Sequence, residues 1–384
     1  MLDLHVILYN ILFLSHKKSG HFNPFHSSSS FRYTMSNIDI VLGTSFGDEG
    51  KGKVIYSLLQ HHPYDLCIRF NGSCNAGHTI YHHQQKIILH QIPIGILFPH
   101  VQNLIASDCL IDLPKLKNEI QSIQSLGISI HNRLFISKAC HIITQESIDY
   151  DRTHNKIGTT GSGIGPTYSL KMLRTGKRVE DFQDEFDKLG IVIVDMRKWW
   201  KNHTKKNILL EGAQGFELDI NWTNHYPYCT SSSCTLGNAI NTGIQIKDIR
   251  NIYGVAKVYD TYVGTMKFQP DDDPNLEKLG EIGQEFGSTT GRKRQCNYLN
   301  LDSLIEALTV NNCTICILNK CDVLQQTNTF RLYYEDELQS FSTWSDMKSF
   351  LIEKLSQWKV IFSSSPFTIY DEQISATKSI LYSA

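Results

Sequence analysis

The segment that most constrains the fold of this chain is the glycine-rich stretch Gly43–Lys53, which directly follows the apolar run Ile38–Leu42. An apolar run that leads into several glycines predicts a buried strand, then a turn, with a helix beginning where the turn ends. Glycines let backbone amides approach phosphate oxygens closely, and the positive end of the following helix favours anions. The sequence therefore predicts an α/β fold with a phosphate-binding loop after its first strand.

This loop departs from the common G-x-x-x-x-G-K-[ST] phosphate loop in two ways. Counting from Gly47, the pair Gly52-Lys53 is in register, but Val54 stands where a magnesium-binding hydroxyl is usual. The acidic pair Asp48-Glu49 lies inside the turn. Carboxylates beside bound phosphate are repelled unless a metal ion or a proton-transfer task holds them there. We therefore expect this loop to take part in chemistry as well as in binding.

Composition excludes several classes of protein. The chain has 384 residues and is 41% apolar, enough for one large α/β domain with a substantial core. Lys and Arg number 37 against 38 Asp and Glu, so no global charge favours nucleic acid or an anionic membrane as a partner. The ten cysteines form no dense framework, and Cys313 and Cys316 lie in an apolar stretch. We expect buried structural thiols in a reducing compartment, hence a cytoplasmic protein, rather than zinc or redox chemistry.

The first 34 residues differ from the rest of the chain. The apolar segment Leu2–Leu14 is interrupted by polar residues and is followed by the serine run Ser27–Ser30. A secretory signal has basic residues before an uninterrupted apolar core, and a bilayer span needs about 20 residues. A transit peptide remains an alternative. The simpler interpretation is that residues 1–34 are a leader that is disordered or not translated, and that residues 35–384 form the catalytic domain.

Strand-like and helix-like segments alternate along the remaining chain. The strand-like runs are Ile38–Leu42, Leu66–Phe70, Lys86–His90, Leu104–Ala106, Leu134–Ile136, Ile208–Glu211, Ile252–Val258 and Ile315–Asn319. The amphipathic segments with helical spacing are Pro114–Leu126, Val179–Leu189, Leu301–Val310 and Asp346–Gln357. This alternation predicts a single large α/β domain with a mostly parallel central sheet, helices on both faces and long functional loops.

A second polar loop, Asn75–Thr79, follows the second predicted strand as the glycine-rich loop follows the first. Both loops leave the carboxyl edge of a parallel sheet, where ligands bind, so His78 could face Asp48 across one pocket. A histidine that titrates near neutral pH can act as a general acid, and a carboxylate aimed at a purine N–H can act as a base. A solvated loop histidine is the alternative interpretation.

The motif Asn319-Lys-Cys-Asp322 follows another apolar run. A carboxylate at Asp322 can accept hydrogen bonds from both the ring N–H and the exocyclic amine of guanine, while the stem of Lys320 packs on the base. Adenine offers no such pair of donors. The alternative is a charged turn after a buried strand.

Three further loops carry hydroxyls, amides or cations. The segment 287–294 places three cations beside hydroxyls and two glycines, as suits closure over a small anion, although a solvated basic turn is the alternative. Gly158–Pro166 could hold a phosphate through backbone amides. Gln214 after a strand is suited to reading a purine oxygen, and Thr230 begins a run of four hydroxyls.

Taken in order, these segments resemble adenylosuccinate synthetase over nearly everything from Met35 to about Leu324. The resemblance implies that the enzyme joins IMP and L-aspartate, with GTP as phosphoryl donor and one Mg²⁺ per site, through a 6-phosphoryl-IMP intermediate. The implied reaction gives adenylosuccinate, GDP and phosphate in purine nucleotide synthesis. The resemblance also implies a homodimer with shared active sites.

The resemblance implies a role for each matching residue. Asp48, His78 and Lys51 would be catalytic, and Asp48 with the backbone of Gly77 would bind the metal. The IMP contacts would be Asn75, Thr160, Gln214, Thr230 and, reaching the neighbouring subunit, Arg174. The aspartate contacts would be Thr289, Thr290, Gly291, Arg292 and Arg294. The GTP contacts would be Gly47, Glu49, Gly50, Lys51, Gly52, Lys53, Lys320, Asp322 and Ser364.

The chain also departs from the usual family pattern. Ser45-Phe46 replaces a common Gln-Trp, Ser162 replaces an arginine, and only Ser363–Pro366 represents the late nucleotide segment. These features resemble the compact archaeal and viral branch, some of whose members use dGMP and carry a smaller residue in place of Asp48. Retention of Asp48 favours IMP, and the dGMP-using relative is the first alternative. A GTP-binding regulatory protein without ligase activity is the second, although Asp48, His78 and Arg292 argue against it.

Overall fold

The computed structural model describes residues 37–154, 157–203, 206–287 and 291–369, which belong to one compact unit spanning Met35–Ala384. The predictions made for residues 1–34 and for Thr289 and Thr290 lie outside the described residues.

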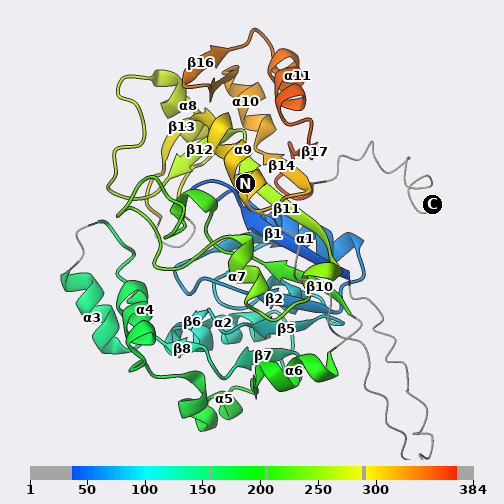
Figure 1. The fold of residues 1–384 in the computed structure, drawn as a ribbon, viewed down its shortest axis with the longest axis vertical. Coiled ribbons are helices and arrows are strands. Elements are labelled where there is room, and N and C mark those ends of the chain that lie inside the picture. The colour runs from blue at the N-terminus through cyan, green and yellow to red at the C-terminus, as the bar shows by residue number, and fades with distance from the viewer. Residues whose placement is uncertain (1–36, 155–156, 204–205, 288–290, 370–384) are drawn as a thin grey trace, which may run out of the picture. The chain divides into compact units, whose positions relative to one another are not determined.

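The centre of the fold is a nine-stranded sheet in which every neighbouring pair of strands is parallel (Figure 1). Its strands, in spatial order, are β17 (Lys359–Phe362), β14 (Ile315–Asn319), β11 (Ile249–Lys257), β1 (Asn37–Gly43), β10 (Asn207–Glu211), β2 (Leu66–Arg69), β5 (Gln102–Ile105), β7 (Leu134–Ser137) and β9 (Val192–Val194). The predicted α/β fold with a mostly parallel sheet is confirmed.

Helices cover both faces of this sheet, because successive residues of each strand point to opposite sides. In β1, Val41 packs into one apolar cluster, whereas Ile40 and Leu42 pack into the other. The first cluster includes α1 (Lys51–His61), α2 (Leu113–Ser125) and α5 (Gln183–Lys188). The second includes α6 (Met196–Asn202), α7 (Leu236–Ile240), α8 (Pro274–Ile282), α9 (Leu301–Val310), α10 (Cys321–Thr327) and α11 (Trp344–Lys354).

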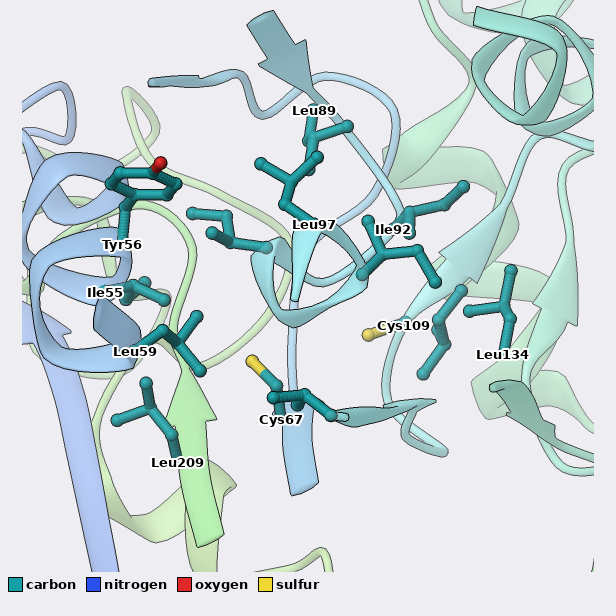
Figure 2. Close-up of a cluster of buried hydrophobic side chains, with 14 of the residues drawn as sticks. Ile55, Tyr56, Leu59, Cys67, Leu89, Ile92, Leu97, Cys109, Leu134 and Leu209 are labelled. Carbon is teal, nitrogen blue, oxygen red and sulfur yellow. The ribbon is translucent and has the colours of Figure 1, made fainter. Parts of the chain in front are cut away.

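Figure 2 shows part of the first cluster, where α1 packs on the sheet. Ile55 and Leu59 of α1 lie against Cys67 of β2 and Leu209 of β10. The helix that begins at the glycine-rich loop is therefore fixed to the sheet by buried apolar side chains.

Several elements were not predicted. A second, mixed sheet contains β12 (Tyr259–Tyr262), β13 (Gln295–Asn300), β15 (Arg331–Tyr334) and β16 (Glu337–Ser340), beside α8 and α10 in Figure 1. The predicted strand at Lys86–His90 forms β4 (Gln85–Leu89), which pairs with β3 (His78–His82) in a hairpin outside the main sheet. The remaining short elements are β6 (Leu110–Ile111), β8 (His141–Ile142), α3 (Gln145–Thr153) and the 3₁₀ helices Ile94–Leu97, Phe216–Leu218 and Ile246–Asp248. The predicted helical segment Val179–Leu189 consists of the 3₁₀ helix Val179–Phe182 followed by α5.

The segment after Gly158 is a loop for only part of its expected length, because α4 (Ile164–Leu173) begins inside it. Gly163 precedes this helix with a φ of 74°, a conformation that favours glycine, and Pro166 lies in the first turn, where a missing N–H is tolerated. The end of the predicted loop Gly158–Pro166 therefore lies in the first turn of a helix.

The loops of the candidate site leave one edge of the main sheet. Because β1, β2, β10, β11 and β14 are parallel neighbours, their carboxyl ends meet at that edge. The topology thus gathers the segments 43–50, 71–77, 211–215 and 319–322, which are far apart in the sequence.

The ten cysteines are free thiols, and nine of them are buried. Burial raises the pKa of Cys313 to about 12, so this thiol stays protonated at neutral pH. Among the described residues, the helices are too short or too polar to cross a bilayer.

Candidate active site

The glycine-rich loop divides its two acids between separate tasks. The Glu49 carboxylate is buried and accepts hydrogen bonds from the backbone N–H groups of Ser45 (3.2 Å) and Gly47 (2.9 Å), and from the ammonium of Lys51. Asp48 has a φ of 57° and a carboxylate that is 31% exposed. The buried Glu49 carboxylate therefore stabilises the loop through its backbone N–H groups, whereas the Asp48 carboxylate is partly exposed.

Two glycines of this loop permit close packing against neighbouring loops. A Cβ at Gly50 would lie 2.9 Å from Nδ2 of Asn319, which donates a 2.7 Å hydrogen bond to the carbonyl of Glu49. A Cβ at Gly52 would lie 3.1 Å from Cβ of His78. The loop after β14 and the start of β3 are thus held against the glycine-rich loop.

Lys53 contacts the last loop of the described chain. Its ammonium donates to Oγ of Ser363 (2.7 Å) and to the carbonyl of Ser365 (2.8 Å), and burial lowers its pKa to about 8. Ser364, between these two residues, is exposed. Lys53 therefore positions Ser364 next to the first turn of α1.

A buried ionic cluster surrounds His78. Nδ1 of His78 lies 2.6 Å from Oε1 of Glu211, and Nη1 of Arg69 lies 2.6 Å from the same oxygen and 3.0 Å from Nδ1. Burial, helped by the charge of Arg69, lowers the pKa of His78 to about 4. Burial alone would raise the pKa of Glu211, but His78 and Arg69 outweigh it and hold that pKa at about 2. At neutral pH, the ionised Glu211 therefore pairs with Arg69 and orients a neutral imidazole.

The hydrogen bonds of His78 within the described chain run to Arg69 and Glu211. Asp48 instead pairs with Arg294, whose Nε lies 2.9 Å from Oδ2 of the carboxylate. Arg69 carries no recognisable sequence signal beyond its place at the end of a strand.

A second buried carboxylate, Glu285, joins two of the candidate segments to residues at the end of β11 and the start of β12. It accepts from the guanidinium of Arg294 and from the hydroxyl of Tyr259 (2.6 Å), and lies 3.3 Å from Nζ of Lys257 and 3.9 Å from Nζ of Lys320. Burial would raise its pKa, but Lys257, Arg294 and Lys320 outweigh burial and hold it at about 2. This ionised group places the cations of the 291–294 and 319–322 segments around one centre.

The basic segment also contacts the loop that follows α3. Nη1 of Arg292 donates to the carbonyl of Gly158 (3.2 Å). Asp151 of α3 holds the same loop, accepting from Oγ1 of Thr159 (2.9 Å) and from the backbone of Gly163 (2.8 Å). Thr160 is exposed on this loop, and Gly291 has a φ of 65°. The structure thus brings the predicted aspartate and IMP segments together.

Three amide side chains at the sheet edge each bury an oxygen with no hydrogen-bond partner among the described residues, namely Oδ1 of Asn75, Oε1 of Gln214 and Oδ1 of Asn319. Their loops are held in place, since Asn71 exchanges hydrogen bonds with the backbone of Ala213 at 2.7 and 3.1 Å. A buried acceptor without a donor is unfavourable, so a ligand with N–H or O–H groups would relieve that cost.

The remaining predicted residues occupy defined places. Gly77 directly precedes β3, and Oγ1 of Thr230 donates to the carbonyl of Ser232 (2.7 Å) in a tight turn. Lys320 has a φ of 66° at the start of α10, and Asp322 lies in the first turn of that helix.

Arg174 lies apart from the loops described above. It is exposed at the end of α4, with a φ of 65°, and lines a cavity of about 400 Å³ with Lys171 and Arg178. None of the glycine-rich loop residues lines this cavity.

Comparison with known proteins agrees with the resemblance noted in the sequence. The family described as adenylosuccinate synthetase matches residues 40–202 and 184–379. Adenylosuccinate synthetase from Pelodictyon phaeoclathratiforme is 36% identical over 354 residues, covering 79% of this chain and 81% of that protein.

Two solved structures are similar to this chain. Fully ligated adenylosuccinate synthetase from Plasmodium falciparum has a TM-score of 0.76 at 27% identity, covering 86% of this chain and 98% of that one. Cyanophage S-2L succinoaminodeoxyadenylate synthetase, bound to dGMP and to dATP as an energy donor, has a TM-score of 0.69 at 19% identity. The match covers 88% of this chain and 94% of that one. At that identity the second likeness shows the fold alone.

We predict that the His78 imidazole stays neutral as the pH falls from 8 to about 5, because its pKa in the folded protein is about 4. In an unfolded chain a histidine has a pKa of about 6.5. The unfolded state therefore binds a proton that the folded state does not, and stability falls as the pH decreases from about 6.5 towards 4. ¹⁵N NMR of the ring, assigned with His78→Asn, measures the titration. A midpoint above pH 6 would contradict the buried cluster.

Proposed function

The chain belongs to the adenylosuccinate synthetase family, whose members are GTP-binding ligases of purine biosynthesis, and we propose that it joins IMP to L-aspartate with GTP as phosphoryl donor. The observation that carries this proposal is the partly exposed Asp48 carboxylate, held by Arg294 at a sheet edge that also presents Asn75, Gln214 and Asn319. A site that only bound nucleotide would need no carboxylate placed there.

In the proposed reaction, the Asp48 carboxylate removes the N1 proton of IMP, and the 6-oxygen attacks the γ-phosphorus of GTP. The bond to the bridging oxygen breaks and GDP leaves, with Lys51 neutralising phosphate charge. His78, oriented by Glu211, assists this transfer at the developing charge. The amine of aspartate then attacks carbon 6, the C–O bond breaks, and phosphate leaves with the former 6-oxygen.

The binding residues follow the same assignment. Lys320 and Asp322 read guanine, while Gly47, Glu49, Gly50, Gly52, Lys53 and Ser364 surround the rest of GTP, with Glu49 and Lys53 acting through the loops that they hold. Asn75, Thr160, Gln214 and Thr230 contact IMP. Arg292 and Arg294, with Thr289, Thr290 and Gly291, bind the carboxylates of aspartate, for which paired guanidinium groups are well suited.

The donor set also fits a magnesium ion, which would neutralise charge on the transferred phosphoryl group. The carboxylate of Asp48 and the backbone carbonyl of Gly77 would hold the ion, whereas the Glu49 carboxylate is occupied by loop amides and Lys51. Among the described residues no group of three or more acids, histidines or cysteines could hold a metal. A pair of protein ligands such as Asp48 and Gly77 suits Mg²⁺, which commonly takes one or two protein ligands and completes its shell with phosphate and water.

The use of dGMP is the alternative substrate assignment. The departures Ser45, Phe46 and Ser162 from the usual family residues are consistent with it, and the cyanophage enzyme shares the fold. Asp48 favours IMP, because a carboxylate at this position leaves less room for a 2-amino group. A regulatory protein without ligase activity is disfavoured by membership of a ligase family.

We further propose a homodimer in which Arg174 of one subunit completes the IMP site of the other, and a cytoplasmic location. The first proposal is supported by the exposed position of Arg174, away from the loops around Asp48. The second is supported by the ten free thiols, which persist in a reducing compartment.

Side-by-side turnover assays with IMP and dGMP, each with aspartate and GTP, test the substrate. We predict turnover with IMP, at least ~10²-fold lower turnover with dGMP, and a loss of ~10²–10⁴ in kcat for Asp48→Asn, because the base is removed. Asp184→Asn, on the exposed face of α5, is the matched control and should behave as wild type. Product from dGMP and none from IMP would identify the chain as the dGMP-using relative.

Mixing two inactive variants tests the shared site. In a mixture of Asp48→Asn and Arg174→Ala subunits, the hybrid dimer has one site with both defects and one with neither. We predict recovery of about one quarter of wild-type activity after subunit exchange. If Arg174 acts within its own subunit, every site in the mixture keeps one defect and no activity returns.

A further inference from the structure

A second cavity, of about 430 Å³, lies beside residues 44–46 at the start of the glycine-rich loop. Its walls come from residues 44–46 of that loop, from Glu217 and His225, and from the strands β12 and β13 of the second sheet. Asp48, His78, Gln214, Arg292 and Lys320 do not line it. The cavity is therefore separate from the proposed substrate contacts, although it shares a wall with the phosphate-binding loop.

Two buried carboxyl groups face this cavity. Asp260 accepts from Oγ of Ser45 (2.5 Å) and from the backbone of Asn300 (2.9 Å). Glu217 donates its backbone N–H to the carbonyl of Ser45 (3.1 Å), and its carboxyl lies 3.8 Å from Nε2 of His225. Ser45 thus connects both acids to the loop.

Among the described residues, no lysine or arginine forms an ion pair with either acid. Burial raises the pKa of Glu217 to about 7, with further contributions from Asp260 and Glu306, and burial raises that of Asp260 to about 6. Burial also lowers the pKa of His225, which is therefore mostly neutral at pH 7. A cation supplied by a ligand would stabilise the ionised form of both carboxylates.

Aromatic and apolar side chains, among them Phe46, Phe268 and Leu304, form another part of the wall, alongside polar side chains such as Asn297 and Ser303. The ring of Phe46 lies 4.8 Å from that of Phe268 and 5.3 Å from that of His225, measured between centroids. Tyr298 lines the same space. The resemblance places a tryptophan at position 46 in related chains, so the smaller phenylalanine leaves room here.

The charge of the lining favours a cation. Besides the two buried acids, Asp336 lines the cavity, and the one lysine in the lining, Lys267, pairs with Asp271. A bare metal ion is a poor fit, because no group of three or more metal-ligating side chains occurs among the described residues. Aromatic faces beside carboxylates instead suit an organic ammonium group, which gains from both.

We propose that this cavity binds a small organic ammonium ion, with its charged group beside Glu217 and Asp260 and its apolar body against Phe46 and Phe268. The site is distinct from the IMP, aspartate and GTP contacts. Its occupant would touch the phosphate-binding loop through Ser45.

The proposal is tested with phenethylamine as the probe and 2-phenylethanol as its neutral counterpart of similar shape. Isothermal titration calorimetry at pH 7.5 should give saturable binding of the amine in the millimolar range or tighter, and at least ~10-fold weaker binding of the alcohol. Glu217→Gln should weaken amine binding by at least ~10-fold, since a neutral amide cannot pair with the ammonium. Glu337→Gln, an exposed carboxylate on β16, is the matched control and should bind as wild type.

Phe46→Trp provides a second variant, because the larger ring fills the cavity without changing its charge, and it should also weaken amine binding by at least ~10-fold. Circular dichroism tests whether each variant is folded. If Glu217→Gln does not fold, amine binding to Phe46→Trp decides the outcome. Equal binding of amine and alcohol, unchanged binding to Phe46→Trp, or no saturable binding up to ~10 mM would overturn the proposal.

Discussion

The contact on which the arrangement of this site most depends is the buried carboxylate of Glu285. It holds Lys257 at the end of β11, Arg294 before β13 and Lys320 after β14, and Arg294 in turn pairs with Asp48. Removing one partner of such a buried ionic group leaves uncompensated charge, which typically costs about 3–5 kcal/mol. The position of the proposed base therefore depends on an acid that contacts none of the proposed substrates.

A second buried carboxylate, Glu211, serves His78 in a similar way, and a third, Glu49, serves the glycine-rich loop. In each case an ionised group inside the protein is satisfied by cations or backbone amides, and a neighbouring polar group is thereby fixed in direction. This arrangement explains why Asp48 and Glu49 are adjacent without sharing a task. The Glu49 carboxylate binds the backbone of its own loop, and the Asp48 carboxylate remains partly exposed for the proposed chemistry.

The sequence predicted those parts of the fold and site that depend on local patterns. Apolar runs identified seven strands of the main sheet, and the glycines or polar motifs that follow some of them identified the loops carrying Asp48, His78 and Lys320. Arg69, Lys257 and Glu285 were missed because their roles depend on contacts with residues far away in the sequence. The second sheet was missed because strands such as Gln295–Asn300 are short and largely polar. The pairing of His78 with Glu211 likewise required the parallel register of β2 and β10.

In the proposed reaction, the 6-oxygen of IMP is phosphorylated and then leaves with phosphate. This transfer is tested with IMP labelled with ¹⁸O at position 6, which is incubated with GTP and aspartate before mass spectrometry of the phosphate produced. We expect one labelled oxygen in the phosphate for each adenylosuccinate formed. Unlabelled phosphate, with the label released to water, would contradict the proposed transfer, because GTP would then have been hydrolysed without passing its phosphoryl group to IMP.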